Sequence, residues 1–179
     1  MKAANRPAIK YSSHKRELRF FFLFIIFFVF GQLLYYAARP ALDPYLVGLL
    51  TVKASSNIIN IVTPDEKTAV SEKMIHSGEF KLYLNDGCEG VDGIVLIVAA
   101  LCAFPVGMKY KLSGIVAGSV IIYLANLSRI IMLYYALKYK NGFFEILHIY
   151  VGQVYIIFIG LIFFILWINM VTHAHEKTG

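Results

Sequence analysis

The sequence predicts an all-α polytopic membrane protein with four transmembrane helices and an extracytoplasmic loop that contains an amphipathic helix and a small β-hairpin. The first observation is composition: 59% of the 179 residues are hydrophobic and only 16% are charged, against about 45–50% and about 25% in soluble domains. The mean hydropathy of +0.66 agrees. The second observation is that the apolar residues gather in four long stretches. Two cysteines are too few for a secreted fold held together by disulfides.

The four stretches are predicted to be membrane helices. Residues 20–38 would extend about 28 Å as a helix, close to the roughly 30 Å of a hydrocarbon core. None of the stretches alternates in the manner of barrel strands, and helices satisfy their own backbone in lipid. The predicted spans are residues 20–38, 91–107, 112–137 and 147–168.

Lysine and arginine determine the predicted orientation, because the cytoplasmic flanks of membrane helices are rich in both. Residues 1–19 carry six such cations, whereas the loop 39–90 carries five basic and seven acidic residues. We therefore expect a multi-pass protein of the cytoplasmic (inner) membrane, with a single integral domain over residues 20–169. Residues 1–19 and 170–179 would be cytoplasmic tails. The net charge of +6 then reflects orientation and attraction to membrane lipids, with no need for nucleic acid.

The first half of the loop predicts a helix. Asp43 and Pro44 are typical of an N-cap and a first-turn proline. Apolar residues recur at roughly helical spacing from 42 to 62, and Pro64 ends the pattern. An amphipathic helix lying on the outer membrane surface is expected.

The second half of the loop predicts two strands. Residues 70–75 and 80–84 are rich in strand formers and flank a polar segment that contains Gly78. A small hairpin is expected, and its second strand would deliver the chain to Asp86 and Cys88. Asp86 is a candidate cap of the following helix.

In this predicted topology, three chemically active residues lie at the same depth in the membrane. Cys88 lies at the outer entrance of the second span, and His148 lies at the outer start of the fourth. Arg129 lies 17 residues after Leu112, about 26 Å along a helix that starts inside. A nucleophile, a fixed cation and a general acid or base would thus meet at the outer membrane face.

Each of these residues also has a structural interpretation. A cysteine often fills a small apolar space, an arginine can extend to the headgroups, and a histidine is common at a membrane interface. Cys102 is interpreted as a filler, because it lies about 21 Å from Cys88 along a regular helix.

Two polar neighbours are candidate supporting residues. Asn126 precedes Arg129 by three residues and is a candidate to steady its guanidinium. Glu145 precedes His148 by three residues and either orients it or is a solvated loop acid. His173 and His175 lack a set of partner ligands, so neither a metal nor another cofactor is expected.

Three short blocks resemble the exosortase/archaeosortase family of membrane transpeptidases, in particular small members such as exosortase H. The blocks are residues 87–91 around Cys88, residues 126–130 around Arg129, and His148 at the start of the last span. Asp92 falls where small members often have an acid. Glu89 departs from the small neutral polar residue expected after the cysteine, which leaves the charge balance around the thiol open.

The resemblance implies a cysteine-dependent peptidase or transpeptidase. Its partners would be exported proteins with a C-terminal sorting signal, composed of a short motif, a membrane helix and a basic cluster. The implied roles are nucleophile for Cys88, oxyanion stabilisation for Arg129 and general acid/base for His148. The acceptor stays open between water, an amine and a lipid headgroup, as does the oligomeric state. The alternatives are a non-catalytic four-helix assembly or export subunit and a thiol-dependent membrane acyltransferase.

Overall fold

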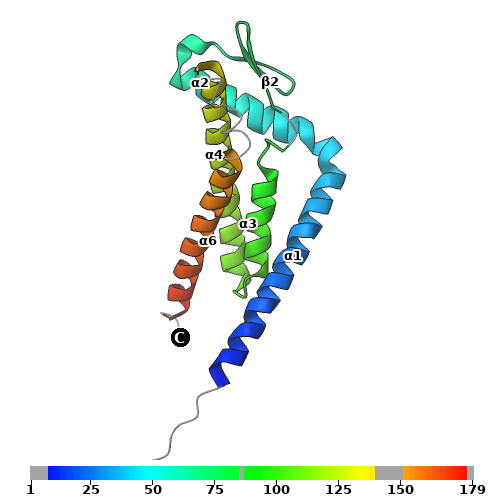
Figure 1. The fold of residues 1–179 in the computed structure, drawn as a ribbon, viewed down its shortest axis with the longest axis vertical. Helices are drawn as coiled ribbons and strands as arrows, with labels where there is room; N and C mark the ends of the chain where they lie inside the picture. The colour runs from blue at the N-terminus through cyan, green and yellow to red at the C-terminus, as the bar shows by residue number, and fades with distance from the viewer. Residues whose placement is uncertain (1–7, 85–86, 140–150, 177–179) are drawn as a thin grey trace, which may run out of the picture.

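The computed structural model describes residues 8–84, 87–139 and 151–176. Most of the described chain is helical. Helix α3 packs against α1, α4 and α6, and α4 also packs against α6, so that α3, α4 and α6 form a bundle with α1 along one side (Figure 1). The bounds of these helices are α1 Ala8–Asp43, α3 Val91–Ala103, α4 Met108–Tyr139 and α6 Gly152–Glu176.

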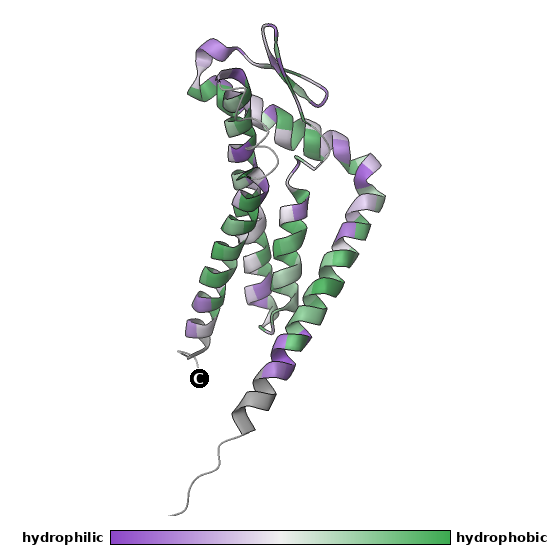
Figure 2. Cartoon of the chain, viewed as in Figure 1, coloured by the Kyte–Doolittle hydropathy of each residue, from purple (hydrophilic) through white to green (hydrophobic). Residues whose placement is uncertain are grey.

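Three of the described helical segments are long and apolar enough to cross a membrane, namely His14–Val62, Met108–Tyr139 and Gly152–His173. Figure 2 shows the hydrophobic residues along the bundle and the hydrophilic ones towards its ends. Helix α3 is apolar but has only 13 residues, or about 20 Å, because Phe104 leaves the helical conformation ahead of Pro105. The predicted span over 91–107 is therefore shorter in the structure, and the four-span topology stays a prediction.

Helix α1 runs directly into the predicted loop helix. A π-helix, η1 (Pro44–Lys53), and then α2 (Ala54–Val62) continue the helical path, which turns sharply and crosses one end of the bundle (Figure 1). The predicted N-cap is wrong: Asp43 is itself helical and makes no side-chain cap bond. Its carboxylate instead contacts Lys73 at 2.9 Å and Arg39 at 3.4 Å. Helix α2 does end before Pro64, as predicted, and Pro64 begins the short 3-10 helix η2 (Pro64–Glu66).

The predicted two-stranded hairpin is a three-stranded antiparallel sheet with the order β1-β2-β3. The predicted first strand is interrupted because Glu72 adopts a left-handed conformation with φ 52°. The predicted turn is present, with Gly78 at φ 60° between β2 and β3. The strands are β1 Ala69–Ser71, β2 Met74–Ser77 and β3 Phe80–Tyr83.

Residues 44–84, from η1 to the sheet, form what we call the cap, which lies over one end of the bundle (Figure 1). A buried cluster beneath the cap joins apolar side chains of η1, α2 and the sheet to Ile130 and Tyr134 of α4. A second cluster lies within the bundle, where Gly114 and Gly118 of α4 allow close approach of α6. Cys88 belongs to the first cluster, so it lies at the junction of cap and bundle.

Candidate active site

The loop of residues 87–90 connects the sheet to α3 and carries the predicted nucleophile. Gly87 and Gly90 both have positive φ angles, 90° and 76°, which residues other than glycine adopt only with strain. Gly90 occupies the N-cap position and α3 begins at Val91. Asp86, the candidate cap, lies outside the described residues. The two glycines therefore allow the sharp turn that holds Cys88 at the start of α3.

Cys88 is buried, with 6% of its surface exposed, and packs in the cluster that contains Ile130 and Tyr134. Its carbonyl oxygen accepts a hydrogen bond of 3.0 Å from Nδ2 of Asn126. Neither Cys88 nor Cys102 forms a disulfide, in agreement with the predicted separation of the two thiols. The hydrogen bond ties the main chain of the cysteine loop to α4.

Arg129 lies near this contact. It follows Asn126 by three residues on the same helix, a rise of about 4.5 Å, and is only 4% exposed. Among the described residues, neither Nε of Arg129 nor Oδ1 of Asn126 has a hydrogen-bond partner. Asn126 therefore binds the cysteine loop and not Nε of Arg129, which differs from the steadying role considered for it. Within the part of the chain that the structure describes, adjacent turns of α4 thus carry a buried donor and a buried acceptor that are unsatisfied.

Glu89, the acid that follows Cys88, is paired in the structure. The carboxylate of Glu89 accepts hydrogen bonds from the Tyr35 hydroxyl at 2.6 Å and from the Gly87 backbone N–H at 2.7 Å. It also lies 3.7 Å from Nη2 of Arg39. The side chain of Glu89 is only 4% exposed, so these partners balance a buried charge.

Helix α1 supplies most of this pairing, and the sequence did not single out its residues. Gln32 donates a hydrogen bond of 3.1 Å to Asp92, while Tyr35 and Arg39 reach Glu89. The three residues recur at i, i+3 and i+7, on one face of the helix. Polar residues at this spacing near the end of an apolar span are the sequence signal from which these three residues could have been identified.

Of the predicted site residues, the structure joins Cys88 to Asn126 by a hydrogen bond. Arg129 is buried one turn beyond Asn126 on α4, and Asp92 lies in the first turn of α3. His148 and Glu145 lie outside the described residues. Within the part of the chain that the structure describes, no group of three or more His, Cys, Asp and Glu side chains is arranged to hold a metal ion.

A pocket of about 260 Å³ lies beside Glu89, between η1 and the helices α3 and α4. Its walls are mostly apolar, with a few polar groups, as is common in pockets that bind organic groups. The lining residues are Leu46, Leu50, Thr51, Glu89, Val91, Ile94, Ser119, Val120 and Tyr123.

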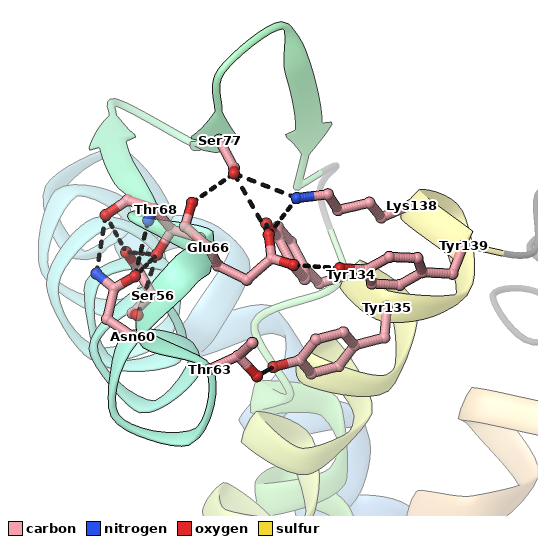
Figure 3. Close-up of polar contacts among 10 residues, drawn as sticks. All are labelled: Ser56, Asn60, Thr63, Glu66, Thr68, Ser77, Tyr134, Tyr135, Lys138 and Tyr139. Carbon is pink, nitrogen blue, oxygen red and sulfur yellow. Dashed lines mark hydrogen bonds and ion pairs between the residues drawn. The ribbon is translucent and has the colours of Figure 1, made fainter.

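A second polar cluster, which the sequence did not predict, fastens the cap to α4 (Figure 3). The buried carboxylate of Glu66 accepts hydrogen bonds of 2.5 Å from Tyr134 and Tyr139 and forms an ion pair with Lys138. Ser77 donates to the Glu66 carbonyl. Burial alone would raise the pKa of Glu66, but the bonds from Lys138 and the two tyrosines outweigh it and lower the pKa to about 2.

The fold and this site define an integral membrane protein with a buried cysteine and arginine at one end of its helices. A family model described as transmembrane exosortase matches residues 13–167. Because the match covers most of the chain, the protein belongs to the transmembrane exosortase family, and the resemblance noted in the sequence is confirmed. Neither a curated protein nor a solved structure matches the chain. Family membership supports a role as a membrane transpeptidase or protease.

Proposed function

We propose that the protein is a cysteine-dependent transpeptidase that removes C-terminal sorting signals from exported proteins at the outer face of the cytoplasmic membrane. The observation that carries the proposal is the hydrogen bond between Asn126 and the Cys88 carbonyl. It joins the cysteine loop to the helix that bears Arg129, which is buried one turn away. A buried cysteine and a buried arginine that are connected through Asn126 are suited to attack on a carbonyl and stabilisation of the resulting oxyanion.

The reaction would proceed in two halves. The thiolate of Cys88 attacks the scissile carbonyl carbon, and the negative charge that develops on oxygen is stabilised by Arg129. As the tetrahedral intermediate collapses, the C–N bond breaks, His148 gives its proton to the leaving amine, and a thioester remains on Cys88. An acceptor, either water, an amine or a lipid headgroup, then loses a proton to His148 and attacks the thioester, which releases the Cys88 thiolate.

The proposed topology has four spans, with both termini in the cytoplasm and the cap outside. The positive charge of residues 1–19 and the acidic balance of residues 39–90 support this orientation. The substrate would carry a short motif, a membrane helix and a basic cluster. Such a helix would keep the scissile bond close to the bundle end at which Cys88 lies.

The decisive experiment is co-expression with a tagged exported protein that carries such a signal. We expect Cys88→Ala and His148→Ala to abolish trimming, and Arg129→Lys to reduce it about 100-fold or more, since lysine keeps the charge but loses the planar donor group. Cys102→Ala is the matched control, because Cys102 lies in α3, away from the cysteine loop, and should leave trimming unchanged.

Undiminished trimming by Cys88→Ala would exclude the mechanism. Trapping of the acyl-enzyme identifies the substrate: a peptide thioester on Cys88 in mass spectra supports the proposal. A lipid acyl group alone on Cys88 would instead favour the acyltransferase. Tolerance of both Cys88 and His148 substitutions, with a stable partner complex, would favour the assembly subunit.

A further inference from the structure

We infer that Asn126 is a positioning residue, which holds the Cys88 main chain against α4 and requires glycine at position 90 to do so. The inference rests on the proposed role of Cys88, and it adds a residue through which the position of the thiol is controlled. Asn126 would act through the cysteine loop and would not itself touch the substrate.

The first support is the hydrogen bond itself. Nδ2 of Asn126 reaches the carbonyl oxygen of Cys88, 38 residues away in the sequence, at 3.0 Å, and both residues are buried. A bond to the main chain of the cysteine restricts the position of its Cα, and therefore of Sγ, within the site. Misplacement of a reacting group by about 1 Å can reduce the rate about 100-fold.

The second support is the close contact with Gly90. A Cβ at position 90 would lie 2.6 Å from Cγ of Asn126 and 2.9 Å from its Nδ2. The backbone of Gly90 also has φ 76°. The glycine is thus required both by its own conformation and by the approach of the asparagine, so the two residues form one unit.

The third support is that stability alone is a poor reason for an asparagine here. The residue has no exposed surface, and within the described chain its Oδ1 accepts no hydrogen bond. A buried unsatisfied acceptor is costly, and an apolar side chain of similar shape avoids that cost. The amide is therefore best explained by what its Nδ2 holds in place.

The test measures alkylation of the two cysteines by iodoacetamide in the purified full-length protein in detergent, with mass spectrometry of each site. Asn126→Leu keeps the branched shape but removes the donor. We expect it to speed the labelling of Cys88 about fivefold, the factor that corresponds to about 1 kcal/mol from one lost hydrogen bond. Labelling of Cys102 should not change, because that thiol reports general loosening of the bundle. Ser128→Ala, which removes a hydroxyl two residues away on α4 that bonds to Ala125 and Tyr155, is the matched control.

Gly90→Ala disturbs the same contact from the loop side, because its Cβ would collide with Asn126. It should also speed the labelling of Cys88. In the double variant Gly90→Ala/Asn126→Ala, the increase in the Cys88 labelling rate should be smaller than the product of the increases in Gly90→Ala and Asn126→Ala alone. The reason is that removal of the asparagine side chain relieves its collision with the new Cβ. Unchanged Cys88 labelling in Asn126→Leu, a parallel rise at Cys102, or fully multiplicative effects in the double variant would each overturn the inference.

Turnover provides a separate readout. With a trimmed substrate, Asn126→Leu should lower kcat about tenfold to 100-fold and leave KM unchanged. If Cys88→Ala still trimmed the substrate, the proposed function would fail, yet the labelling result would still decide whether Asn126 positions Cys88.

Discussion

The ion pair that fastens the cap to α4 makes a quantitative prediction for Glu66→Gln. The pKa of Glu66 falls from an ordinary 4.5 to about 2 in the folded protein. A difference of that size corresponds to about 3 kcal/mol of stabilisation of the charged form. The side chain of Glu66 is 3% exposed, so little of this stabilisation is lost to screening by water. Glutamine keeps one acceptor oxygen but presents an N–H₂ group where Lys138 and the tyrosines donate, and we expect most of the 3 kcal/mol to be lost.

The assay is thermal unfolding of the purified protein in detergent, followed by circular dichroism. At pH 7 a loss of about 3 kcal/mol should lower Tm by roughly 6–12 °C for a chain of this size. Glu79→Gln is the matched control, because Glu79 is an exposed acid in the turn between β2 and β3, and it should change Tm by less than about 2 °C.

The contribution of Glu66 to stability also depends on pH. Because folding lowers the pKa of Glu66, its stabilisation is complete above about pH 5 and disappears as the pH falls towards 2. Wild-type protein should therefore lose stability between pH 5 and 2 more steeply than Glu66→Gln. An unchanged Tm at pH 7, or equal slopes in this range, would refute the assigned role of the ion pair.

Two further substitutions test the packing and the pairing on which the site depends. Gly118→Ala places a Cβ 2.8 Å from a ring carbon of α6. The substitution should reduce the free energy of unfolding by about 1–3 kcal/mol, measured as a lower Tm. The control Gly48→Ala, whose added Cβ has no atom within 4 Å, should leave Tm unchanged, and equal effects of the two variants would contradict the close packing. Tyr35→Phe removes the 2.6 Å hydrogen bond to Glu89 and should reduce the free energy of unfolding by about 1.5–3 kcal/mol. The control Tyr36→Phe, at a position that is 72% exposed, should leave that free energy unchanged. An unchanged free energy in Tyr35→Phe would show that other groups satisfy the carboxylate of Glu89.

Features that depend on local periodicity were predictable from the sequence. Helix α4 extends over the predicted span 112–137 and ends two residues beyond it, because a long apolar run with a single charge has no other stable form in lipid. The proximity of Cys88 to the segment that bears Arg129 also followed from helix length and chain direction alone. The Asn126 hydrogen bond to Cys88 agrees with that depth argument.

Features that depend on tertiary contacts were not predictable. Asp43 and Pro44 have the pattern of a helix start. In the structure, however, Asp43 is helical and forms ion pairs with Arg39 and Lys73. The turn at Glu72 and Lys73 divides the predicted strand, and Lys73 leaves the sheet to meet Asp43. The burial and pairing of Glu66 could not be predicted from its neighbours in the sequence, since its partners on α4 are at least 68 residues away.

The two polar clusters share one structural element, and this explains why the site is well defined although its loop is rich in glycine. Helix α4 donates to the cysteine loop through Asn126 and to the cap through Tyr134 and Lys138. Between these levels, Ile130 and Tyr134 pack against Cys88 in one buried cluster. A displacement of the cap would therefore disturb the packing around the thiol, and a displacement of the loop would break its bond to the same helix. The helix that carries Arg129 is thus also the support on which the position of Cys88 depends.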